Sequence, residues 1–217
     1  MRDAGNIHEI EQLGVDMIGL IFYPKSPRYV NMVSSHSGII PDKAAKGMDN
    51  ITGGNGKVKL VGVFVDDLPQ NIITRIYNYR LDFVQLHGEE TPEMIQNLKR
   101  TVVPDIRKEL KVIKAISIAD KTDLEKCRQY EGIADLLLFD TKCSTAGGSG
   151  EKYDWTILSA YEGTTPFMLG GGIAPDDAER IKAFTHPMFY GIDLNSRFET
   201  EPGIKDATLI ETFMKRL

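Results

Sequence analysis

The chain has 217 residues, which suits one α/β domain, since parallel α/β barrels run from about 200 to about 250 residues. Hydrophobic residues make up 41% and charged residues 26%, a balance typical of a globular protein and not of a disordered one. The formal net charge of -5 gives no general attraction for nucleic acid or anionic membranes, so an anionic ligand would need a local positive site.

The ends and the cysteines bear on location. No apolar run approaches the ~18 residues of a membrane span, and the polar start from Met1 to Asn6 lacks the apolar segment of a signal peptide. Two cysteines, Cys127 and Cys143, do not make a disulfide framework, which favours a reducing compartment. We therefore expect a cytoplasmic protein.

Short apolar runs rich in β-branched residues dominate the sequence. Their near-continuous apolar character is typical of strands covered on both faces, as in parallel sheets. Segments with helical spacing lie between them, so the alternation predicts βαβ units. The runs cover residues 16–22, 59–65, 82–86, 111–115, 134–139, 166–169 and 188–192. Helices are expected over 3–13, after Thr91-Pro92, over 120–130, after Ala174-Pro175 and over 208–217.

The chain thus opens on a helix, which Gly14 would end. A closed TIM (β/α)8 barrel needs eight strands, each followed by a helix. The pattern predicts a single barrel domain over residues 1–217 that lacks its first β-strand. Residues 31–57 should hold the second helix, but they are polar and rich in glycine, so we expect a poor helix and a mobile loop.

Candidate site residues follow the predicted strands, because barrel active sites lie at the carboxyl ends of the strands. Arg28 suits an anionic group through its paired donors, although a solvated basic loop has the same pattern. Gln85 and His87 are two apart on one strand and so point the same way. Asp140 ends a very apolar strand, where desolvation would raise its pKa and suit it to general acid catalysis. The alternative for Asp140 is a structural contact to loop amides.

A phosphate site is predicted at the last two strands. Gly170, Gly171 and Gly172 open a helix, where backbone N–H groups and the helix N-terminus attract anions. Asp193, Asn195 and Ser196 follow the last run and would complete the cup. No Cys/His/Asp cluster has metal-ligand spacing. Cys127 fits a packing role, whereas Cys143 is either a loop residue or a reactive thiol.

Taken together and in order, these motifs resemble the phosphoribosylanthranilate isomerase family of tryptophan biosynthesis. The resemblance covers nearly the whole chain except about residues 33–57. The matching segments are 19–29, 61–65, 84–88, 140–141, 147–150, 153–155, 170–172 and 203–206.

The resemblance implies an Amadori rearrangement of N-(5-phosphoribosyl)anthranilate to 1-(2-carboxyphenylamino)-1-deoxyribulose 5-phosphate, without a cofactor. A general acid opens the furanose ring, and a general base then removes the proton from C2. By similarity, Asp140 is the general acid, Arg28 contacts the anthranilate carboxylate, Gln85 and His87 line the substrate pocket, and Gly171, Gly172, Asp193, Asn195 and Ser196 form the phosphate site.

One departure concerns the base. The family opens with a strand that ends in Lys-x-Cys-Gly, and that cysteine is the general base, whereas Met1-Arg2-Asp3 here align just after it. We therefore expect an N-terminally shortened isomerase with low stability and little activity. The alternatives are another ribose-phosphate barrel enzyme, such as a lyase or synthase, and a non-catalytic phosphate-ligand binder. The expected partner is a phosphorylated small molecule, with the chain a monomer or homodimer that binds neither nucleic acid nor membrane.

Overall fold

The structure is a computed structural model that describes residues 1–30, 58–141 and 154–217. The predicted poor helix and loop over 31–57 therefore lie outside the described residues, as do Cys143 and the glycine-rich segment 146–150.

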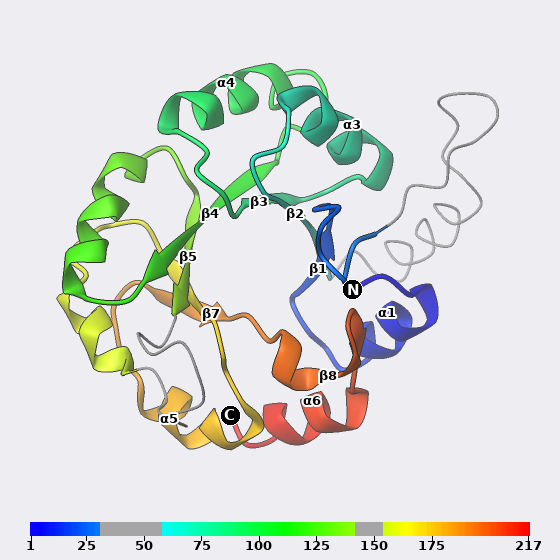
Figure 1. The fold of residues 1–217 in the computed structure, drawn as a ribbon, viewed down its shortest axis with the longest axis vertical. Coiled ribbons are helices and arrows are strands. Elements are labelled where there is room, and N and C mark those ends of the chain that lie inside the picture. Colours follow the sequence, from blue (N-terminus) through cyan, green and yellow to red (C-terminus); the bar gives the residue numbers. More distant parts are fainter. Residues whose placement is uncertain (31–57, 142–153) are drawn as a thin grey trace.

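A parallel sheet of seven strands in chain order forms the centre of the molecule (Figure 1). Each strand coincides with one of the predicted apolar runs, so that prediction is confirmed. The strands are parallel because each connection returns over the outside of the sheet. They are β1 (Met17–Ile21), β2 (Lys59–Phe64), β3 (Phe83–Leu86), β4 (Lys111–Ile118), β5 (Leu136–Thr141), β6 (Phe167–Gly170) and β7 (Phe189–Ile192).

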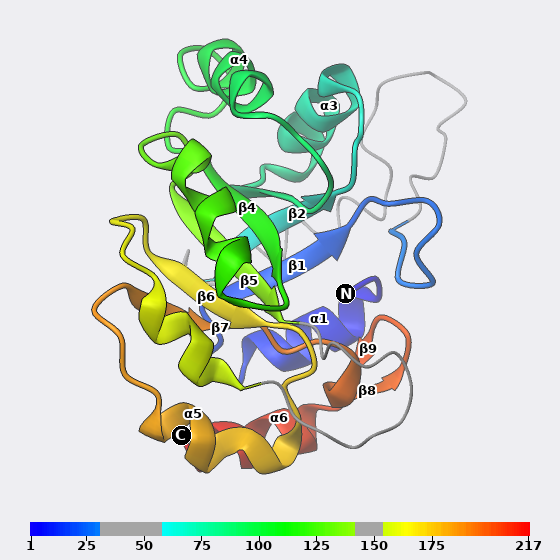
Figure 2. The same ribbon diagram turned by 60° about the vertical axis from the view of Figure 1, so that its left-hand side comes forward.

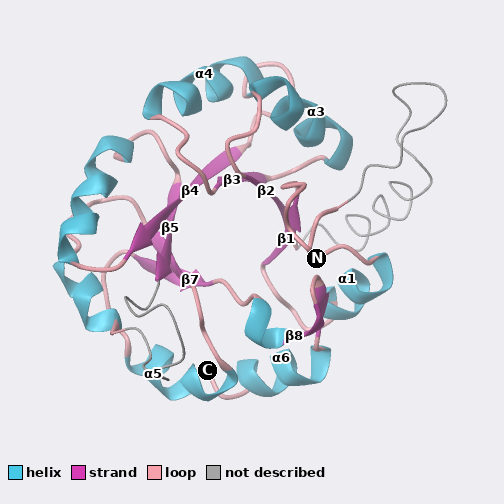
Figure 3. Ribbon diagram, viewed as in Figure 1, coloured by secondary structure: helices cyan, strands magenta, loops and turns pink. Residues whose placement is uncertain are grey.

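Helices surround this sheet (Figure 3). The α-helices are α1 (Ala4–Glu11), α3 (Pro69–Tyr79), α4 (Pro92–Val102), α5 (Ala178–Ala183) and α6 (Ala207–Met214). The 3₁₀ helices are η1 (Lys121–Tyr130), η2 (Trp155–Ala160), η3 (Pro175–Asp177) and η4 (Ser196–Phe198). Thr91 caps α4 as predicted, because its side chain accepts from the Met94 amide. An antiparallel pair, β8 (Glu199–Glu201) and β9 (Ile204–Lys205), was not predicted.

The strand residues alternate between two hydrophobic clusters. One cluster fills the space inside the curved sheet and includes Phe83, Ile113, Leu138 and Met168. The residues between them pack outward under the helices, as Phe139 does. Residues that follow the inward-facing positions by two therefore also face the barrel interior. At the carboxyl ends of the strands, such side chains lie at the mouth of the barrel.

The two outer strands of the sheet differ from the rest. Among the described strands, β1 pairs with β2 and β7 with β6, and Ile21 of β1 also forms an isolated parallel bridge with Tyr29. The α-amine of Met1 donates to the Gly19 carbonyl, and the Val30 amide donates to the Ile21 carbonyl at 2.8 Å. A Cβ atom added to Gly191 of β7 would meet nothing within 4 Å. The fold is TIM-barrel-like, with seven described strands in its central sheet.

Helix α1 and β9 lie side by side between these two strands (Figure 2). The Asn6 side chain joins them, because its Nδ2 donates to the Lys205 carbonyl at 2.8 Å and its Oδ1 accepts from the Lys205 amide at 2.7 Å. Asn6 is buried. This paired amide contact ties the first helix to the last turn of the chain before α6.

Candidate active site

Three predicted side chains meet at the carboxyl ends of β3 and β5. The side chains of Gln85, His87 and Asp140 point to the same side of the sheet as the inward-facing residues of β3 and β5. They lie close together although β4 separates the two strands. The Gln85 Nε2 lies 3.1 Å from His87 Nδ1, and His87 Nε2 lies 3.4 Å from Asp140 Oδ2. Gln85 is buried, whereas the His87 and Asp140 side chains keep 34% and 19% exposure. Both can therefore be reached from the mouth of the barrel.

The contact with Gln85 sets the tautomer of His87. An amide nitrogen can only donate, so Nδ1 of the neutral imidazole accepts and Nε2 carries the proton. That proton points at the Asp140 carboxyl group. The pair therefore places an imidazole N–H donor beside the carboxyl group that is the candidate acid.

Arg28 is held by an unpredicted partner, Glu199 of β8. Arg28 Nε donates to both Glu199 oxygens at 2.9 and 2.8 Å, and Nη2 lies 2.6 Å from Oε2. Lys205 Nζ lies 3.1 Å from the same carboxylate. Burial alone would raise the pKa of Glu199, but the hydrogen bonds from Arg28 and the charge of Lys205 outweigh it, and the pKa is lowered. Glu199 thus stays ionised and fixes the plane of the guanidinium group.

Buried and partly buried titratable groups lie beside this network. Asp193 lies directly after β7, and its amide donates to the Leu169 carbonyl of β6 at 2.7 Å. Burial raises the pKa of Asp193 despite the opposing charge of Lys205. Burial also lowers the pKa of Lys205, against the attraction of Glu199, and it lowers that of the Met1 α-amine to about 5. Several groups with shifted pKa values therefore lie beside the Arg28–Glu199 pair.

The predicted phosphate residues occupy the loops after β6 and β7. Gly171 and Gly172 adopt φ values of 76° and 70°, a left-handed conformation that strains any residue with a Cβ. Asn195 and Ser196 lie at the start of η4 and are exposed. The Asn195 Oδ1 accepts from Lys205 Nζ at 3.4 Å, so that residue is linked to the Arg28 network.

The remaining described groups offer neither a thiol base nor a metal site. Cys127 is buried in η1, and burial raises its pKa to about 12, in agreement with the predicted packing role. Among residues 1–30, 58–141 and 154–217, no group of three His, Cys, Asp or Glu side chains could hold a metal ion.

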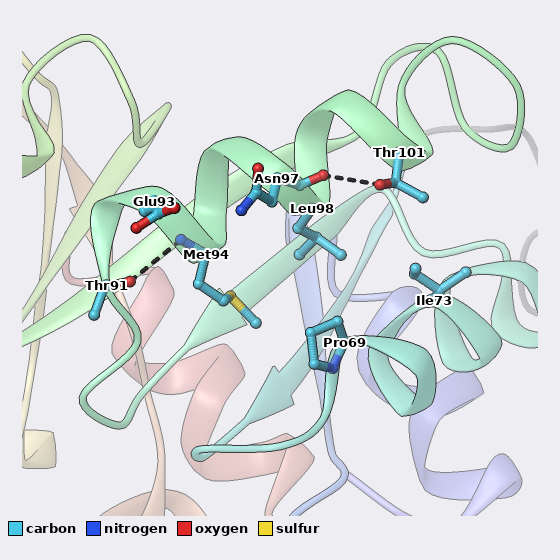
Figure 4. Close-up of a pocket in the computed structure, with 8 residues that line it drawn as sticks. All are labelled: Pro69, Ile73, Thr91, Glu93, Met94, Asn97, Leu98 and Thr101. Atoms are coloured by element: carbon cyan, nitrogen blue, oxygen red, sulfur yellow. Dashed lines mark hydrogen bonds between the residues drawn. The ribbon is translucent and has the colours of Figure 1, made fainter.

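A separate groove lies between α3 and α4 on the outside of the barrel (Figure 4). It has a volume of about 330 Å³, and Pro69, Ile73, Met94 and Leu98 are among its lining residues. None of the candidate site residues lines it, so it is distinct from the barrel mouth.

The family of the chain is decided by its match to a family model. The model of N-(5'-phosphoribosyl)anthranilate (PRA) isomerase matches residues 4–216. The chain belongs to this family. Its relatives include PRA isomerases of Parabacteroides distasonis, 42% identical, and Phocaeicola vulgatus, 41% identical. Both matches cover 100% of this chain, and they cover 90% and 94% of those relatives.

Solved PRA isomerases have the same fold. The enzyme from Thermotoga maritima matches with a TM-score of 0.80 at 28% identity, over 100% of this chain and 94% of that one. A PRA isomerase in complex with reduced 1-(o-carboxyphenylamino)-1-deoxyribulose 5-phosphate matches with a TM-score of 0.76 at 26% identity, over the same shares. In the described part of this chain, no helix is both long and apolar enough to cross a membrane.

Proposed function

We propose that the chain is built to isomerise N-(5'-phosphoribosyl)anthranilate by an Amadori rearrangement, in tryptophan biosynthesis and in the cytoplasm. One observation carries the proposal. This chain belongs to the PRA isomerase family, and its candidate acid, Asp140, lies at the carboxyl end of β5 and faces the barrel interior. The Nε2–H of His87 is directed at the Asp140 carboxyl group from 3.4 Å. The wider alternatives of a different ribose-phosphate enzyme or a simple phosphate binder have no observation of their own in their favour.

The proposed roles follow the geometry. Asp140 protonates the ring oxygen, which breaks its bond to C1 and leaves the C1–N double bond of the opened iminium form. Loss of the C2 proton to a base then gives the enolamine, which tautomerises to the ketone. His87 hydrogen-bonds to the Asp140 carboxyl group, and Gln85 keeps His87 in the donating tautomer.

The substrate's two anionic ends would lie on opposite sides of this centre. Arg28 binds the anthranilate carboxylate, with Glu199 fixing its guanidinium group. Gly171, Gly172 and the loop from Asp193 to Ser196 receive the phosphate through backbone amides. This division explains how a chain of net charge -5 would bind a substrate that carries both a carboxylate and a phosphate.

For the 217-residue chain on its own we propose slow turnover. Its buried Cys127, with a pKa of about 12, cannot serve as the base, and Cys143 lies outside the described residues. The comparisons give no support to a shortened chain, since the family model matches from residue 4 and the relatives from Parabacteroides distasonis and Phocaeicola vulgatus match 100% of it. The proposal rests instead on the sheet order, in which β1 and β7 are the outermost described strands and do not pair with each other.

Turnover and binding assays separate these claims. The purified chain is compared with a version that carries a Lys-x-Cys-Gly strand before Met1, by chromatographic measurement of product. We expect binding of the reduced product analogue by both proteins and fast turnover by the extended one only. Equal turnover would refute the slow-turnover proposal, and failure of both proteins to bind the analogue would refute the isomerase proposal. Asp140→Asn in the extended protein should lower kcat by about 10² to 10⁴.

The oligomeric state is proposed as monomer or homodimer. One of the solved relatives is described as a monomer generated from a dimeric isomerase of Thermotoga maritima. Light scattering on the 217-residue chain distinguishes the two states directly.

A further inference from the structure

Lys114 of β4 is a buried cation that the proposed mechanism does not use. It lies between Ile113 and Ala115, which both face the barrel interior, so its side chain leaves the sheet on the opposite side, toward η1. Its Nζ lies 5.7 Å from the centre of the Tyr130 ring. Only 3% of the Lys114 side chain is exposed, so solvent does not satisfy its charge.

The Lys114 ammonium group instead binds the end of β3. Its Nζ lies 3.2 Å from the Leu86 carbonyl and 2.6 Å from the Gly88 carbonyl, the two residues on either side of His87. It also lies 3.2 Å from Glu90 Oε2, whose side chain is likewise 3% exposed. A single buried cation thus holds the backbone before and after the candidate site histidine.

Glu90 extends this contact to the loop after β2. Its carboxylate accepts from the Gly88 amide at 3.0 Å and from the Asp66 amide at 2.9 Å. Asp66 in turn accepts from the Glu89 amide at 2.7 Å and adopts an unusual φ of 48°. A Cβ on Gly88 would lie 2.3 Å from the Asp66 carboxylate, so the two loops interlock without room for a side chain.

We propose that Lys114, paired with Glu90, is a positioning residue that fixes His87 against Asp140. It acts from behind the sheet, through the carbonyls of Leu86 and Gly88, and touches neither the substrate nor the reacting atoms. A buried ion pair is seldom the most stable choice, because an apolar pair of similar volume often stabilises as well. The directed contacts to both neighbours of His87 are what an apolar pair would lack. The inference rests on the proposed function only for the ligand used in its test.

The test uses the full 217-residue chain with Lys114→Met and with the double variant Lys114→Met/Glu90→Gln. The double variant leaves no unpaired charge, so it keeps the test available if the single variant does not fold. Lys99→Met is the matched control, because Lys99 also joins a carbonyl and a carboxylate, at 3.0 and 2.8 Å, but away from the site. The readouts are ¹⁵N NMR of the His87 ring, assigned with His87→Asn, and titrations with the reduced product analogue and with inorganic phosphate.

The expected result separates positioning from general stability. In the double variant the His87 ring signals shift away from the single Nε2–H tautomer, and the analogue binds about tenfold more weakly, which is roughly the worth of one hydrogen bond. Phosphate binding stays unchanged, and the control variant behaves as the parent. Unchanged His87 signals in the double variant, or an equal shift in the control, overturn the proposal. If the parent fails to bind the analogue, the proposed function fails, and the His87 signals alone still decide the positioning role.

Discussion

Glu199→Gln tests how firmly the candidate substrate-binding arginine is held. Removing one partner of a buried ion pair costs about 3–5 kcal/mol. The Glu199 side chain is only 4% exposed, but Arg28 keeps 22% exposure and can turn toward water. Glutamine also retains one acceptor for it. We therefore expect the free energy of unfolding to fall by about 2 kcal/mol at neutral pH.

Urea denaturation measures this loss, with the slope of the transition expected to stay constant. The control is Glu211→Gln, which breaks an exposed pair with Lys215 and should cost less than about 0.5 kcal/mol. A cycle with Arg28→Met should give a coupling energy above about 0.5 kcal/mol. A loss for Glu199→Gln no larger than that of the control would refute the reasoning.

The same variant carries a pH signature. The pKa of Glu199 in the folded chain is lowered from the usual 4.5, so its ionised form stabilises the fold above that pH. The advantage of the parent over Glu199→Gln should therefore persist down to about pH 4.5 and shrink as the pH falls further. A gap that widens in acid would contradict the assigned sign.

Three further predictions concern the packing of the core, the reactivity of a buried thiol and the stability of the fold at high pH. Phe167→Ala should lower the free energy of unfolding by about 3–5 kcal/mol, because this fully buried ring stacks on Phe139 with ring centres 4.6 Å apart. Tyr190 is 59% exposed, so Tyr190→Ala should change stability by less than about 0.5 kcal/mol in the same urea denaturation assay. In a Cys143→Ser variant, Cys127 should resist a thiol reagent at pH 8 in the folded chain and react once urea is added, because burial raises its pKa to about 12. Fast labelling of the folded variant would contradict this. Stability should fall as the pH rises above about 9, because burial raises the pKa of Cys127 and of Tyr161 in the folded chain. The unfolded chain therefore releases these two protons at a lower pH than the folded chain does. Urea denaturation at pH 7 and at pH 10 measures the difference.

Local patterns predicted the sheet and the centre of the site. Parallel strands buried on both faces must be apolar throughout, so each strand was visible as a run of such residues. Gln85 and His87 were placed together by the two-residue period of a strand, and Asp140 by the rule that active sites lie at strand ends. The raised pKa expected for Asp140 and the phosphate role of the loops stay predictions.

Other features depend on distant contacts or on finer spacing. Glu199 pairs with Arg28 across 171 residues, and β8 and β9 are too short to show an alternating pattern. Lys114 is a cation inside the apolar run over residues 111–115, and a charge at such a position indicates a buried partner. The helix expected over 120–130 is a 3₁₀ helix, in keeping with buried Leu124 and Cys127 at intervals of three.

The hydrogen bonds between the Asn6 side chain and the Lys205 backbone have a consequence for folding during synthesis. The two residues are 199 positions apart, so α1 cannot dock on β9 until nearly all of the chain has been made. At about 5–20 residues per second, synthesis leaves the first helix waiting about 10–40 s for its partner. During that time its apolar face, with Ile7 and Ile10, has only β1 and the early strands to cover it. The first helix therefore stays incompletely packed during synthesis, and its apolar face is open to chaperones and to wrong association until β9 has been made.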